Sequence, residues 1–167
     1  DQVVAMTSDQ FQTLNRAQVA ALTSTQVGAI ETNDLVSLLT AQLTWFSGTQ
    51  IKGLSASQLS ALTTDRIQVL SGDSVAGLTT GQVVNLSTDQ VKSLTSTQIG
   101  KLSSAQINAM ETRDLVQLSS SQIASFSAAA LSGVATSQIS KITTDQIAGL
   151  TATQIKAMTT AQVKALT

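Results

Sequence analysis

Two pairs of carboxylates come closer than any other residues of this chain to a catalytic or metal-binding pattern. Glu31 and Asp34 lie three residues apart, and Glu111 and Asp114 repeat this arrangement 80 residues later. Hydrolysis would need a partner base or nucleophile nearby, and calcium usually takes about six to eight oxygen ligands. Because only two carboxylates are local at each place, we favour a structural role, in which Asp supplies negative charge to the first turn of a helix. A weak divalent-ion site is the alternative.

The composition removes most other chemistry. The 167 residues contain no His, Cys, Tyr or Pro, so the chain has no imidazole base, thiolate nucleophile, disulfide or ordinary zinc site. Trp45 is the single Trp and could serve as a ligand platform, although a bulky aromatic more often fills a gap in the packing. We therefore expect no catalytic residues, no cofactor, no metal site and no enzymatic activity, and we identify no ligand-binding residue.

Charge and hydropathy narrow the choice of partners. Nine Lys and Arg against ten Asp and Glu give a net charge of -1, too weak a field to attract nucleic acid. No run of about 18 apolar residues could span a bilayer, and no basic start followed by an apolar stretch resembles a signal peptide. We expect neither a nucleic-acid partner nor membrane insertion.

A repeat of eight residues runs through the whole chain, so we treat residues 1–167 as a single repeat array. Twenty octads follow one another without insertion from Thr7 to Leu166. Position 1 is Ser or Thr in fifteen octads and position 4 is Gln in fifteen, whereas positions 5 and 8 are apolar in all twenty. Residues 1–6 fit the end of a preceding octad and Thr167 the start of a following one, so we expect a longer array.

A second period of ten octads divides the array into units at residues 7–86 and 87–166. The octads at 31–38 and 111–118 are close copies, as are those at 63–70 and 143–150, and Phe46 corresponds to Phe126. Duplication of an 80-residue block explains this period. The alternative, that ten octads also complete a turn of a superhelix, stays open.

The octad favours an all-α solenoid of about twenty very short helices, one in each repeat. A single continuous helix would advance about 80° per octad beyond two full turns, so no one face could be buried. In a strand, positions 5 and 8 would point to opposite faces, which leaves a β-solenoid as the weaker alternative. Ser or Thr followed three residues later by Gln is instead a capping box, a helix-start signal that belongs to the consensus of the eight-residue repeat.

Each predicted helix runs from about position 2 to position 7 or 8 and packs through positions 5 and 8. Such short helices are marginal alone, so stability must come from stacking neighbouring repeats. Small residues at position 7 would let helices approach closely. Glycines at this position, near the helix end, fit either a left-handed backbone or a close approach: they are Gly53, Gly77, Gly133 and Gly149.

Besides Asn15, which can still cap a helix, five octads depart from this pattern without an acidic replacement. Arg66, Ser74 and Ala130 replace the Gln at position 4, and Leu39 and Ala135 replace the capping residue at position 1. We expect these departures to loosen their octads and to mark bends. Amide hydrogen exchange faster in octads 63–70, 71–78 and 127–134 than in their neighbours would support this expectation.

The segments LTSTQVGAI, TTDQIAGL, LTATQIKAM and TTAQVKAL resemble the LTxxQIxAL repeats of very large bacterial surface or secreted proteins of the adhesin or hemagglutinin-like kind. The resemblance covers essentially the whole chain. It implies an exported stalk or filament segment, located outside the cell or on the bacterial cell surface, whose partners are neighbouring repeats of the same longer chain.

We therefore predict a non-catalytic structural repeat segment, a spacer or stalk. The alternative from another functional class is a solenoid module that binds a surface protein or glycan, with positions 3 and 6 setting its specificity. Rows of Ser and Thr also suggest an ice-binding surface. This third function is less favoured because the hydroxyls at position 1 are needed for capping, and positions 2 and 3 form no consistent row.

Overall fold

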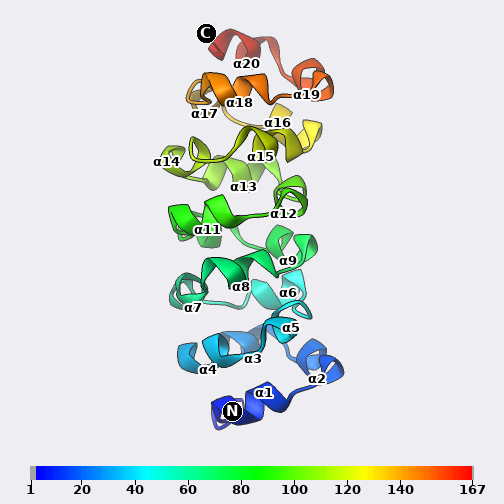
Figure 1. Ribbon diagram of the computed structural model, residues 1–167, viewed down its shortest axis with the longest axis vertical. Coiled ribbons are helices and arrows are strands. Elements are labelled where there is room, and N and C mark those ends of the chain that lie inside the picture. Colours follow the sequence, from blue (N-terminus) through cyan, green and yellow to red (C-terminus); the bar gives the residue numbers. More distant parts are fainter. Residues whose placement is uncertain (1–2, 167) are drawn as a thin grey trace.

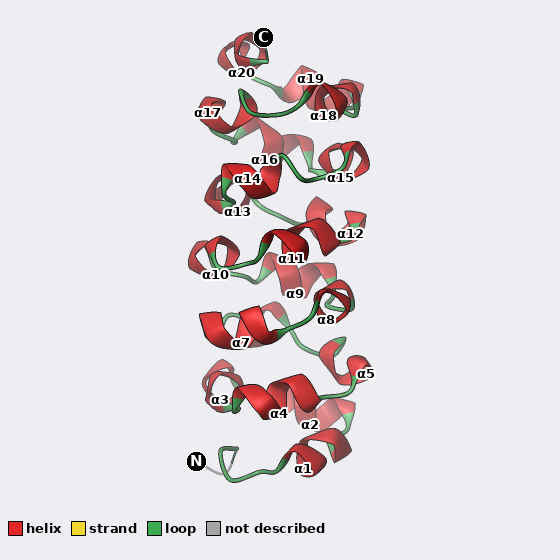
Figure 2. Ribbon diagram, turned by 60° about the vertical axis from the view of Figure 1, so that its left-hand side comes forward, coloured by secondary structure: helices red, strands yellow, loops and turns green. Residues whose placement is uncertain are grey.

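The computed structural model describes residues 3–166, and within this range the chain is helical with no strand (Figure 2). The all-α prediction is confirmed, and the β-solenoid alternative is wrong. Each of the twenty octads contributes one helix, which begins at position 2. The helices are α1 Ser8–Thr13, α2 Arg16–Ala21, α3 Ser24–Ala29, α4 Thr32–Ser37, α5 Thr40–Leu43, α6 Gly48–Ile51, α7 Ala56–Ala61, α8 Thr64–Gln68, α9 Gly72–Ala76, α10 Thr80–Val84, α11 Thr88–Ser93, α12 Ser96–Gly100, α13 Ser104–Ala109, α14 Thr112–Leu115, α15 Ser120–Ser125, α16 Ala128–Ser132, α17 Thr136–Ile139, α18 Thr144–Ala148, α19 Ala152–Ala157 and α20 Thr160–Ala165.

The predicted capping box starts most of these helices. In α12, for example, the Thr95 hydroxyl accepts from the Gln98 N–H, and the Gln98 side-chain oxygen accepts from the Thr95 N–H. Both bonds are present in thirteen helices, one of which uses Asn15 in place of Ser or Thr. Each box pairs two backbone groups at the helix start that would otherwise need water.

The turns between helices use ordinary extended backbone. Leu62 at position 8 has φ -72° and ψ 125°, and the next residue, Thr63, has φ -66° and ψ 163°. Within residues 3–166 no residue, glycine included, has a positive φ. Because any L-residue adopts these angles, the array makes its turns without Pro or left-handed Gly, and every helix ends by position 7. The left-handed alternative for the position-7 glycines is therefore wrong.

The helices stack into an elongated superhelix, with α1 at one end and α20 at the other (Figure 1). Helices that pack side by side are three octads apart, as in α6 with α9 and α12 with α15. Side chains at position 4 bond to the fourth preceding octad, as Gln98 does to the Leu70 carbonyl. One turn therefore takes between three and four octads, so ten octads do not form a single turn. The boundaries of the two 80-residue units stay a prediction.

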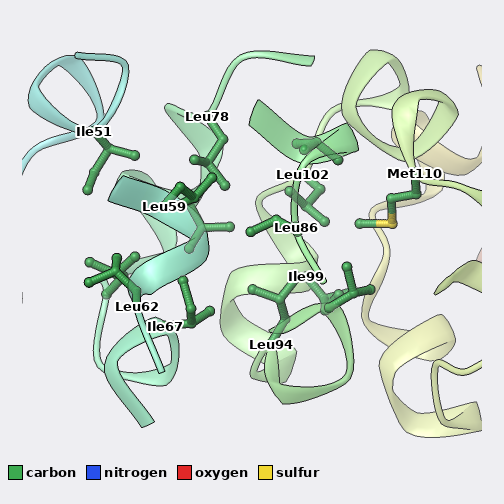
Figure 3. Close-up of a cluster of buried hydrophobic side chains, with 14 of the residues drawn as sticks. Ile51, Leu59, Leu62, Ile67, Leu78, Leu86, Leu94, Ile99, Leu102 and Met110 are labelled. Atoms are coloured by element: carbon green, nitrogen blue, oxygen red, sulfur yellow. The ribbon is translucent and has the colours of Figure 1, made fainter. Parts of the chain in front are cut away.

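Positions 5 and 8 form one continuous aliphatic core along the stack. The buried cluster runs from Val3 to Met158, and Figure 3 shows how successive octads contribute to it: Leu59 and Ile67 from position 5 lie among Leu62, Leu86 and Leu94 from position 8. Octads in the middle of the array bury both of their apolar residues in this core. This mutual burial supplies the stability that a helix of four to six residues lacks on its own.

The glycines at position 7 lie where helices of adjacent turns approach closely. Position 7 of one octad faces position 2 of the octad three before it, as Gly77 faces Gly48 and Gly53 faces Ser24. A Cβ atom built on Gly77 would overlap the backbone of Gly48. The close-approach interpretation of these glycines is confirmed. None of the helices described here is long and apolar enough to cross a membrane.

Candidate functional site

The feature that connects one turn of the superhelix to the next is the Gln side chain at position 4. Gln98 donates from Nε2 to the carbonyl oxygens of Ile67, at 2.7 Å, and Leu70, at 2.8 Å. Its Oε1 meanwhile accepts from the Thr95 N–H at 2.8 Å. One buried side-chain amide thus caps the N-terminus of its own helix and donates to two carbonyls at the end of a helix four octads earlier.

The same arrangement recurs along the chain, and we name these residues the glutamine ladder. In every case Nε2 donates to the carbonyl of the residue 28 positions earlier, over 2.6–2.9 Å. The twelve members are Gln42, Gln50, Gln58, Gln82, Gln90, Gln98, Gln106, Gln122, Gln138, Gln146, Gln154 and Gln162. Because helix ends leave carbonyls unsatisfied, the ladder removes a repeated cost of burying them.

The ladder explains why position 4 is Gln and never Glu. A capping box accepts either residue, and the helix dipole favours the acidic one. Only Gln, however, carries an N–H₂ group to donate across the turn while its oxygen caps the helix. The sequence predicted that this Gln caps its helix but did not predict that its N–H₂ group donates to the neighbouring turn. The presence of fifteen Gln and no Glu at position 4 was the signal for this second role.

The residues that replace Gln at position 4 differ in whether they donate to the carbonyl 28 residues earlier. Ser74 is fully buried, and its hydroxyl donates to the Phe46 carbonyl, 28 residues earlier, as a ladder Gln would. Ala130 has no side-chain donor, and Arg66 places Nη1 in a buried position without a hydrogen-bond partner. Helices α8, α9 and α16 nevertheless form at these octads. Whether they are less protected than their neighbours stays a prediction.

The two octads in which Leu39 and Ala135 replace the capping residue also keep their helices. Gln42 still accepts from the Leu39 N–H at 2.8 Å, so half of the capping box survives. At Ala135 the N–H donates instead to the side-chain oxygen of Asn108, at 2.8 Å, which leaves Oε1 of Gln138 buried and unpartnered. Asn108 also donates to the Gly133 carbonyl, so a side chain of an earlier turn bonds to the backbone on both sides of Val134.

The carboxylates of Asp34 and Asp114 also form contacts between turns. Asp114 is buried, and its Oδ1 accepts from the Thr88 hydroxyl of the octad three before it. Asp34 does the same with the Ser8 hydroxyl. In most octads the Gln at position 4 donates to a carbonyl four octads earlier. In these two octads the Asp at position 4 instead accepts from a hydroxyl three octads earlier. Glu31 and Glu111 are exposed, so each pair places one carboxylate inside and one outside.

Removing the hydroxyl that faces Asp114 should destabilise the array. We expect Thr88→Ala to lower the free energy of unfolding by about 1–3 kcal/mol, because it leaves a buried carboxylate without its donor. Thermal unfolding followed by circular dichroism measures the change. The control is Thr160→Ala, at an exposed position 2, for which we expect a change within about 0.5 kcal/mol. Equal effects of the two substitutions would contradict this role.

Trp45 lies just beyond α5 and is half-buried against the aliphatic core. This placement agrees with the gap-filling interpretation. It forms no site with the carboxylates in the part of the chain that the structure describes.

The outer surface combines the consensus position 1 with positions 3 and 6, which vary between octads. Positions 1 and 3 are exposed in all twenty octads, and position 6 is exposed in most of them. Ion pairs among the described residues join Lys101 to Asp73 at 2.9 Å and Arg113 to Glu111 at 2.8 Å, and Arg113 also lies 3.6 Å from Oδ1 of the buried Asp114. Over residues 3–166 there is neither a pocket nor a group of three His, Cys, Asp or Glu side chains placed to hold a metal ion.

The comparison with protein families matches the repeat itself. A family model described as ALTTAQ repeat matches residues 27–64, 71–104 and 107–144, which together make up about two thirds of the chain. The first and third matches begin and end 80 residues apart, in step with the ten-octad period. No curated protein matches the chain. The matching family is one of repeats and not of catalytic domains.

Proposed function

Since the chain belongs to the ALTTAQ repeat family, we propose that it is a non-catalytic structural segment, a spacer or stalk, of a long bacterial surface or secreted protein. Its partners in this role are neighbouring repeats of the same longer chain. The resemblance to LTxxQIxAL repeats supports the location outside the cell or on its surface. The match to a repeat family supports a structural role without chemistry.

One observation carries the proposal, namely the constant register of the contacts between turns. The ladder bond joins residues 28 apart in all twelve cases, from Gln42 with Leu14 to Gln162 with Val134. A segment built this way can grow by adding octads without changing any existing contact. Its length then depends on the number of repeats alone, which is the property that a spacer needs.

The length of engineered arrays tests this function. Inserting a second copy of residues 87–166 after Leu166 turns twenty octads into thirty and should raise the maximum dimension in small-angle X-ray scattering by about half. The cross-sectional radius should stay unchanged. A maximum dimension that does not grow, with a larger cross-section, would show that the units fold back on one another and would overturn the spacer role.

A binding module is the second candidate, and the exposure of position 3 in all twenty octads favours it. This position varies among Ser, Thr, Ala, Gly, Asp, Asn and Arg, so it could present a specific surface to a protein or glycan. A glycan array probed with the chain tests this function. Selective binding that is lost when Arg113 is replaced by Ala, and retained in the matched Ala105→Ser control, would support the module over the spacer.

A further inference from the structure

Helices ten octads apart lie on the same side of the superhelix. In Figures 1 and 2, α7 lies on the same side as α17, and α8 on the same side as α18. Contacts between adjacent turns explain this alignment. Helix α8 packs against α11, α11 packs against α14, and Gln146 of the α18 octad donates to Leu115 and Leu118 of the α14 octad. Steps of three, three and four octads thus span ten octads in three turns, so octads of one side form a column parallel to the long axis.

Most acidic residues lie in one such column, which we name the acidic column. It consists of the octads at 7–14, 31–38, 63–70, 87–94, 111–118 and 143–150. Eight of the nine acidic residues within residues 3–166 belong to it, and with three basic residues they give a net charge of -5. The two at position 4 are buried and the other six are exposed. Each acidic residue of the first 80-residue unit has an acidic copy in the second: Asp9 and Asp89, Glu31 and Glu111, Asp34 and Asp114, and Asp65 and Asp145.

A second column carries the opposite charge, and we name it the basic column. It consists of the octads at 15–22, 47–54, 71–78, 95–102, 127–134 and 151–158. Their helices α2, α6, α9, α12, α16 and α19 follow the right-hand side of Figure 1, whereas α4, α11 and α14 of the acidic column lie to the left. One acidic residue, Asp73, and four exposed basic residues give this column a net charge of +3. The basic residues are Arg16, Lys52, Lys101 and Lys156.

We propose that the acidic column of one chain binds the basic column of a second copy, side by side. Opposite charges on two surfaces favour their encounter and fix the direction of approach. A single exposed ion pair contributes little, but two straight columns can form several pairs along their length. Because the two columns differ and lie on different sides, one chain can use both at once, and further copies add sideways. This association goes beyond the spacer role, since a spacer can stand alone or in bundles.

Sedimentation velocity over a range of protein and salt concentrations tests the association. At low ionic strength the weight-average mass should rise with protein concentration above that of the single chain. At about 1 M salt it should return to the single-chain value, because charges are then screened beyond about 3 Å. A single-chain mass at every protein concentration in low salt, or association that persists unchanged at about 1 M salt, would overturn the proposal.

Charge reversal in each column tests which surfaces meet. Asp65→Lys with Asp145→Lys changes the acidic column, and Lys52→Glu with Lys156→Glu changes the basic column, all at exposed side chains. Each double variant should weaken self-association about tenfold or more. Mixed in equal amounts, the two variants should form dimers and nothing larger, because one keeps an intact basic column and the other an intact acidic column. Circular dichroism checks that both remain helical.

The matched control places Lys at exposed position 3 of four octads that belong to neither column. It changes the net charge by the same amount as the acidic-column variant and should retain self-association. The substituted residues are Thr25, Ser57, Ala105 and Ser137. Association lost equally in this control would show that net charge alone governs it, and association unchanged in both column variants would show that other surfaces meet. Either result would overturn the proposal.

Discussion

Gln98→Glu should be among the most destabilising single substitutions in this array, lowering the free energy of unfolding by about 3–5 kcal/mol. The substitution keeps the oxygen that caps α12 and replaces the N–H₂ group that faces the carbonyls of Ile67 and Leu70. A buried carboxylate would then lie against two carbonyl oxygens with no donor between them. Lowering the pH until this carboxyl takes up a proton should recover part of the stability, because the protonated group has an O–H to donate.

The matched control for this prediction is Gln18→Glu. Gln18 caps its own helix through Oε1 at 2.9 Å, is exposed, and donates to no carbonyl of residues 3–166 across the turn. We expect this variant to change stability by no more than about 0.5 kcal/mol, or to gain slightly from the helix dipole. Thermal and urea unfolding measure both variants. Equal losses at the two positions would show that capping alone, and not the ladder, makes Gln necessary.

The second large effect is expected from Gly77→Ala. Gly77 has φ -75°, so its backbone accepts any L-residue, and an added methyl group would meet the backbone of Gly48 in the adjacent turn. Overpacking of this kind costs about 1–3 kcal/mol, and rigid backbone on the facing side places this substitution at the upper end. Unfolding followed by circular dichroism gives the loss of stability.

Gly81→Ala separates this crowding from the general effect of replacing a glycine. A Cβ at Gly81 would have open space, with no atom nearer than Thr79 Oγ1 at 4.0 Å. There we expect a gain of up to about 1 kcal/mol, because Ala favours the helix more than Gly does. If Gly77→Ala also stabilises the protein, the helices of adjacent turns do not cross as closely as described. The 80-residue copy of the Gly48 and Gly77 pair is Ala128 and Ala157, so a wider crossing is compatible with the fold.

The local structure could be predicted from the sequence because its signals lie within one octad. The capping-box consensus predicts that each helix begins at position 2, and apolar positions 5 and 8 identify most of the core residues. The turns were harder to anticipate, since a chain with so many reversals and no Pro suggested special backbone at the glycines. Two successive extended residues, such as Leu62 and Thr63, make the reversal instead.

The contacts between turns could not be placed from the sequence. Whether a Gln reaches the octad three, four or ten units away depends on the pitch of the superhelix, and no single octad contains that information. The contacts also explain why the octads at Ser74 and Asp114 keep their helices. Each replacement finds another partner across the turn, the Phe46 carbonyl for Ser74 and the Thr88 hydroxyl for Asp114. At these two octads a residue that departs from the consensus therefore keeps a hydrogen bond to a neighbouring turn, with a different donor or acceptor.

Hydrogen exchange of the Gln side-chain amides, resolved by NMR at low protein concentration, tests the ladder most directly. The twelve ladder glutamines, whose Nε2 groups bond to carbonyls 28 residues earlier, should exchange slowly. Gln10, Gln18 and Gln26 occupy the same octad position, but their Nε2 groups find no acceptor in the described part of the chain, so they should exchange at the rate of solvent-exposed amides. If all fifteen side chains exchange at that same fast rate, the glutamines do not join the turns, and the account of this fold is wrong.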